Sequence, residues 1–109
     1  MKDHRLIDER SRAFGEAIAV RLADHPSWIP RAQQTVERWL ATADPRVRPA
    51  LMEWRAQLRG PVAGVIGVLT GRDERSTRLR QSNPFAGVLP VPERNEILRR
   101  FARHESVST

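Results

Sequence analysis

The chain has 109 residues, a formal net charge of +6 and no cysteine. Its length indicates one domain with a modest hydrophobic core. The lack of cysteine excludes disulfides, thiolate zinc sites and cysteine nucleophiles. No apolar stretch is long enough to span a membrane and the N-terminus is too charged for a secretory signal, so we expect a cytoplasmic protein without membrane contact.

Arginine dominates the basic residues, since Lys2 is the one lysine in the chain. A genome of high GC content would produce this bias. Recognition of phosphate or carboxylate would also produce it, because the planar guanidinium pairs with both in two-pronged fashion. The charge is spread evenly along the chain and forms no basic tail.

Two amphipathic helices are predicted in the first forty-two residues. Residues 3–24 place apolar side chains on one helical face; they are Ile7, Phe14, Ile18 and Leu22. Ser27 is placed to cap the second helix, which runs to about Thr42. The His25-Pro26 pair separates the two helices.

A third and a fourth helix follow. Asp44-Pro45 is a start signal, although Pro49 lies so near it that ordered turns are expected only from there to Gly60. Residues 61–70 have apolar side chains at helical spacing, but their β-branched, glycine-rich composition also fits a strand. We favour the helix because a lone strand has no partner elsewhere. Gly64 and Gly67 would then let another helix approach closely.

The C-terminal third contains two more predicted helices and an irregular segment. Asp73 can cap a short basic helix at residues 72–81, and Pro92 starts a last helix whose Ile97, Leu98 and Phe101 face inward. Residues 82–91 lie between them. The fold class we predict is all-α: a compact bundle of five or six short helices forming a single domain over residues 1–104, with a frayed tail at 105–109.

The sequence contains no catalytic constellation that we recognise. The three histidines have no metal-ligand spacing. The glycines between Gly60 and Gly71 lack the lysine of a phosphate-binding loop. We therefore predict that the chain is not an enzyme and uses no metal, cofactor or small-molecule substrate.

Nucleic-acid binding remains an alternative. The first three helices are joined by short turns, as in a helix-turn-helix unit, and the third would have to read bases. Its outer face carries an ordinary mixture of polar side chains, namely Arg48, Glu53, Arg55, Gln57 and Arg59. The basic helix at residues 72–81 is the better positive patch, although Asp73 and Glu74 can pair with its arginines within the helix.

The stretch from Leu79 to Leu98, LRQSNPFAGVLPVPERNEIL, is not explained by core-building alone. It places four polar side chains directly before an aromatic, which is more than a turn requires. Phe85 either covers one end of the bundle or is exposed as an anchor for a partner. In the second case the polar side chains before it would form a rim that confers specificity.

This stretch resembles a C-terminal pattern, LRQ-x-SPFAG-V-L-x-P-x-E-R followed by an apolar helix, found in antitoxins of small bacterial toxin–antitoxin pairs. The toxin in such pairs is a nucleotidyltransferase of the AbiEii class, as in the mycobacterial MenAT modules. The likeness also includes IAVRLADHP, RAQQTVERWLA and PALMEWRAQLRGP, and so covers most of residues 10–101. The sequence departs from the pattern at Asn83, where serine is expected, and at Asn95, where an aromatic is usual.

The resemblance implies an all-α antitoxin that binds its cognate toxin and blocks nucleotide transfer to tRNA. Arginines would meet the acidic metal-binding carboxylates of the toxin, and Phe85 would fill an apolar pocket. The alternative is a small helical nucleic-acid-binding protein or regulator, and an antitoxin could also bind its own promoter. The predicted partner-binding residues are Arg75, Arg78, Arg80, Gln81, Ser82, Asn83, Phe85 and Arg94.

Overall fold

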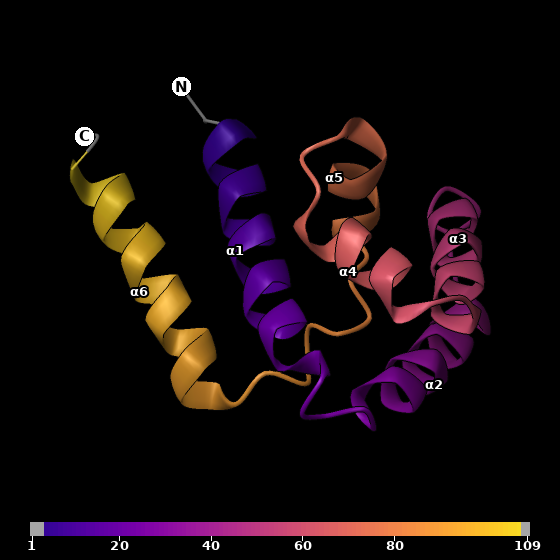
Figure 1. The fold of residues 1–109 in the computed structure, drawn as a ribbon. Helices are drawn as coiled ribbons and strands as arrows, with labels where there is room; N and C mark the ends of the chain where they lie inside the picture. The colour runs from indigo at the N-terminus through magenta and orange to yellow at the C-terminus, as the bar shows by residue number, and fades with distance from the viewer. Residues whose placement is uncertain (1–3, 108–109) are drawn as a thin grey trace.

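The chain folds into six helices joined by short turns and one longer loop (Figure 1). The computed structural model describes residues 4–107. The helices are α1 (His4–Leu22), α2 (Trp28–Leu40), α3 (Arg48–Arg59), α4 (Val62–Thr70), α5 (Glu74–Arg80) and α6 (Val91–Val107). No strand occurs within the described range, which confirms the predicted all-α class.

The helices are arranged around α4 and α5, which lie between α1 on one side and α3 on the other (Figure 1). Helix α2 packs against α3. Helix α6 packs chiefly on α1 and runs antiparallel to it. The ion pair between Arg21 and Glu93 joins α1 to the start of α6. The loop at residues 81–90 crosses from α5 to α6 beneath this arrangement.

The core is one cluster to which every helix contributes. Helix α2 shows the simplest pattern, because Trp28, Ala32, Val36 and Leu40 recur at helical spacing and are all buried. In α1 the same periodicity buries Ile18 and Leu22, but Ile7 is 41% exposed. The apolar face of α1 is therefore buried at its C-terminal end and partly exposed at its N-terminal end.

The crossing of α1 and α4 depends on Gly15, a glycine to which the sequence analysis gave no role. Gly15 of α1 is buried against the backbone of Leu69 in α4, and an added Cβ would lie 1.8 Å from the Leu69 carbonyl oxygen. Around Gly67 there is no atom within 4 Å of such a Cβ, and Gly64 meets only the side chain of Gln57. The predicted role in helix contact is therefore wrong for Gly67, whereas Gly64 is approached by one side chain of α3.

The helix boundaries follow the proline and capping signals in most places. Asp73 caps α5, since its carboxylate accepts the Ser76 backbone N–H at 3.1 Å. Residues 62–70 form a helix, as we favoured over a strand. Ser27 makes no side-chain capping bond, because its own backbone is already helical. The Ser27 cap is therefore a wrong prediction.

Helix α6 carries less of the core than its sequence pattern suggested. Ile97 is buried and Phe101 half-buried, but Leu98 is 40% exposed because α6 has one inward face only. Asn95 is exposed, so replacing the usual aromatic there costs no core packing. The helix continues to Val107, into the segment 105–109 that we expected to be frayed, and residues 108 and 109 lie outside the described range.

Candidate functional site

The loop at residues 81–90 is fixed by a turn that its own sequence encodes. The Asn83 side-chain oxygen accepts the Phe85 backbone N–H at 2.9 Å. The Asn83 carbonyl accepts the Ala86 N–H at 3.2 Å, and the Phe85 carbonyl accepts the Val88 N–H at 3.0 Å. Asparagine therefore does in this turn what the serine of the resembled pattern can also do, which is to bond the backbone two residues ahead.

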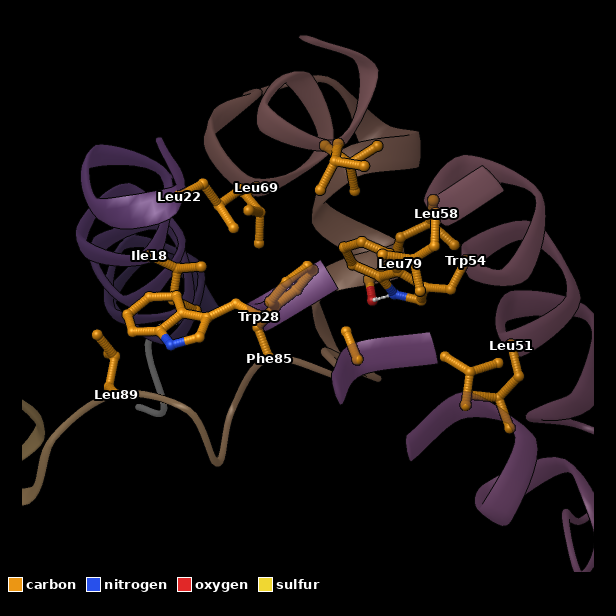
Figure 2. Packing of buried hydrophobic residues seen from close by; sticks show 14 of the residues in the cluster. Ile18, Leu22, Trp28, Leu51, Trp54, Leu58, Leu69, Leu79, Phe85 and Leu89 are labelled. Atoms are coloured by element: carbon orange, nitrogen blue, oxygen red, sulfur yellow. Dashed lines mark hydrogen bonds between the residues drawn. The ribbon is translucent and has the colours of Figure 1, made fainter. Parts of the chain in front are cut away.

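Phe85 anchors the loop to the interior of this chain. Its side chain is fully buried and meets Trp54 edge-on, with ring centroids 6.1 Å apart at 66° (Figure 2). An aromatic enclosed in this way has no surface left for a partner. Of the two interpretations of Phe85, the packing role is correct and the exposed anchor is wrong.

Trp54 also positions the end of α5, from which the loop departs. Its indole N–H donates to the Leu79 carbonyl at 2.7 Å, in the buried contact drawn in Figure 2. The same carbonyl accepts the Ser82 N–H at 3.0 Å. The loop is thus held by one hydrogen bond at its entry and by an aromatic side chain a few residues later, so its exposed atoms are displayed on a rigid base.

Arg80 is built into the fold. Its side chain is 5% exposed, and one terminal nitrogen donates to the carbonyls of Val68 at 2.8 Å and Gly71 at 2.7 Å. These are carbonyl groups that the C-terminal end of α4 leaves without a helical partner. Burial, followed by the nearby charge of Arg12, lowers the pKa of Arg80. The prediction that Arg80 lies on an exposed polar rim is wrong, because α5 is enclosed by three other helices.

Arg75 and Arg78 remain on the surface but share one carboxylate. Both guanidinium groups lie 3.0 Å from the carboxylate of Glu53 in α3. Their ion pairs are therefore between helices and not within α5 as the sequence suggested. Burial raises the pKa of Glu53, but the hydrogen bonds and charges of the two arginines outweigh it and leave that pKa below its ordinary value.

Three predicted residues of the loop and Arg94 of α6 lie at the surface. Gln81 is exposed, whereas Ser82, Asn83 and Arg94 are half-buried. All of these except Ser82 line a cleft of about 440 Å³ between α1, the loop and α6, which we call the α1 cleft. Its lining residues are Ile7, Asp8, Arg10, Ser11, Phe14, Arg80, Gln81, Asn83, Ala86 and Arg94.

A second cleft, the α2 cleft, lies where the loop meets α2. It has a volume of about 330 Å³ and is lined by Arg31, Gln34, Thr35, Arg38, Trp39, Pro84, Gly87 and Val88. Trp39 packs against the edge of the core, but it is half-buried and opens onto this cleft.

Neither a metal site, a membrane span nor a similar protein identifies a function for this chain. Among the side chains that the structure describes, no group of three or more His, Cys, Asp or Glu could hold a metal ion. None of the helices in that range combines the length and apolar character that a membrane span requires. Comparison of the chain with protein-family models, curated proteins and solved structures found no match.

Proposed function

We propose that this chain is a protein-binding module that acts as the antitoxin of a nucleotidyltransferase toxin. The observation that carries the proposal is the anchored loop at residues 81–90, which contains the central part of the resembled motif and lines two surface clefts. Both clefts combine arginine and amide groups with apolar side chains, a composition found in protein interfaces. The toxin class comes from the sequence resemblance.

Of the arginines first expected to face the toxin, Arg94 is retained, and Arg75 and Arg78 give way to other arginines of the clefts. Arg75 and Arg78 already share Glu53, so two positive charges and one negative charge leave a net charge of +1 there. The arginines of the clefts, such as Arg10 and Arg94 in one and Arg31 and Arg38 in the other, have no ion pair with a carboxylate of the described chain. They are the side chains we expect to meet the acidic site of the toxin, where they would block nucleotide transfer to tRNA.

Co-expression with the product of the adjacent gene tests this proposal. We expect the two proteins to co-elute in size-exclusion chromatography and to stay together through a salt series, since an interface with an apolar centre resists salt better than phosphate contacts do. Absence of a complex, together with duplex DNA binding that falls steeply with salt, would favour the nucleic-acid alternative.

A glycine pair supplies matched variants for the same experiment. A Cβ added at Gly87 or at Gly67 meets no atom within 4 Å, and neither glycine has a positive φ, so both positions are open to a side chain and suit a glutamate substitution. Gly87 lines the α2 cleft, whereas Gly67 lies on α4 away from both clefts. We expect Gly87→Glu to weaken the complex and Gly67→Glu to leave it intact. Equal effects of the two substitutions would place the interface elsewhere.

Helix α3 gives little support to the nucleic-acid alternative. Arg55 donates two hydrogen bonds to the carboxylate of Glu37, at 2.8 and 2.9 Å, and Glu53 is held by two arginines of α5. Arg48 donates to the Leu40 carbonyl at 3.1 Å. These polar side chains of α3 are therefore occupied within the fold and are not arranged as a free base-reading face.

A further inference from the structure

The α1 cleft has a buried guanidinium in its wall, Arg80, which feels the charges of Asp8, Asp73 and Glu16 but forms no ion pair with any of them. Arg80 has no ion pair within 4.0 Å in the described chain, and the acceptors for its terminal nitrogens are neutral carbonyl and hydroxyl oxygens. Its Nε is enclosed and has no hydrogen-bond partner. A charge taken out of water without a counter-ion is costly, so an anion placed close to it is strongly favoured.

A second guanidinium in the same cleft shares this property. Arg94 of α6 also has an enclosed Nε without a hydrogen-bond partner, and it has no ion pair with a described carboxylate. Arg10 stands on the α1 side of the cleft, and Asp8 is the one acidic residue in its lining. Three positive charges against one negative charge leave the cleft with a net charge of +2.

The remaining lining limits what kind of anion fits. Ile7, Phe14 and Ala86 supply apolar surface, and the amides of Gln81 and Asn83 supply hydrogen-bond donors. A nucleic-acid backbone needs a row of cations along its length, which a cleft lined by three arginines and one aspartate does not provide. A single carboxylate attached to an apolar segment matches both the net charge and the apolar walls.

We propose that the α1 cleft receives a side-chain carboxylate of the partner protein, held by Arg94 and Arg10 over the buried charge of Arg80. This inference rests on the proposed protein-binding function and names the chemistry of one contact within it. Arg80 acts as a positioning residue whose charge is fixed by its bonds to the end of α4. Arg94 and Arg10 are the groups that would form the two-pronged pair.

A small-molecule titration tests the cleft without the partner. Benzoate carries a carboxylate on an apolar ring, and benzamide has nearly the same shape without the charge. We expect benzoate, at millimolar concentration, to shift the arginine Nε–H signals of Arg94 and Arg10 in proton–nitrogen correlation spectra, and benzamide to leave them in place. Equal shifts with both compounds, or none with benzoate, would overturn the carboxylate site.

Two glutamine substitutions on α6 test the contact in the complex. Arg94 lines the cleft, whereas Arg99 is exposed on the same helix and pairs with Glu96. We expect Arg94→Gln to raise the Kd for the toxin about tenfold and Arg99→Gln to change it by less than about twofold, since loss of one partner from a charge pair weakens binding most where water is excluded. Arg80 is unsuitable for this test because its substitution would disturb α4.

The two experiments separate the two proposals. If the wild-type chain forms no complex while benzoate occupies the cleft, the antitoxin function is refuted and the carboxylate site is supported. If the complex forms and Arg94→Gln binds as tightly as Arg99→Gln, the site is overturned and the function stands. A tenfold loss confined to Arg94→Gln, with unchanged circular dichroism, supports both.

Discussion

Replacing Gly15 with alanine tests the close crossing of α1 and α4, on which the core is built. The new Cβ would lie 1.8 Å from the Leu69 carbonyl oxygen and 2.8 Å from its carbon, whereas real Cβ contacts essentially never fall below 3.0 Å. The opposing atoms belong to the backbone, so no change of rotamer relieves the conflict. Helix α4 has to move away from α1, and the core side chains between them lose contact.

The expected loss of stability in Gly15→Ala is the difference between the cost of overpacking and the gain in helix propensity. Overpacking a core costs about 1–3 kcal/mol, and a conflict with rigid backbone belongs at the upper end of that range. Alanine in place of glycine within a helix returns about 1 kcal/mol. We therefore expect Gly15→Ala to lower the free energy of unfolding by about 2 kcal/mol or more, a large share of the roughly 5–15 kcal/mol typical of a domain.

Gly67→Ala is the matched control, because the helix term acts there without the conflict. No atom lies within 4 Å of a Cβ at this position on α4. We expect a gain of about 0.5–1 kcal/mol. Urea unfolding followed by circular dichroism should place the midpoint of Gly15→Ala below wild type and that of Gly67→Ala above it. A Gly15→Ala protein as stable as wild type would refute the crossing.

Three further substitutions test the loop anchors and one helix pair. Phe85→Ala should lower the free energy of unfolding by about 3–5 kcal/mol through loss of a buried aromatic, as measured by urea titration; a loss below about 1 kcal/mol would contradict the burial. Trp54→Phe removes the indole bond to the Leu79 carbonyl and should cost at least about 1 kcal/mol, also by urea titration; an unchanged midpoint would argue against that bond. The hydrogen bonds from Arg55 lower the pKa of Glu37 below its ordinary value near 4.5, so wild type should be more stable than Glu37→Gln above that pH. This advantage should vanish as the pH falls through the lowered pKa, and urea midpoints whose difference does not change between neutral and acidic pH would contradict the pairing.

Much of the helix layout could be predicted from local sequence. The spacing of apolar residues and the prolines located every helix, and Asp73 was correctly predicted as a cap. These signals work because helix ends and amphipathic faces are set by residues a few positions apart. The choice of helix over strand at residues 62–70 was also correct, because helical spacing outweighed β-branched composition there.

The candidate site was harder to predict because its residues depend on contacts between helices. Helix α5 has one large apolar residue, so its sequence suggests a wet surface, yet packing against α1, α3 and α4 encloses Ser76, Leu79 and Arg80. Phe85 is buried against Trp54, which is distant in the sequence and adjacent in space. Its burial could therefore not be predicted from the neighbouring residues. The motif lies at residues 79–98, so it gave no indication that Arg10 of α1 lines the same cleft.

Nucleotide transfer by the partner is the most direct measurement of the central claim. The product of the adjacent gene would be assayed for transfer of labelled nucleotide to tRNA while this chain is added in increasing amounts. We predict that transfer falls to background as the chain approaches a stoichiometric ratio, and that Gly87→Glu requires a larger excess than Gly67→Glu. Undiminished transfer in the presence of an excess of folded wild-type chain would contradict the antitoxin account.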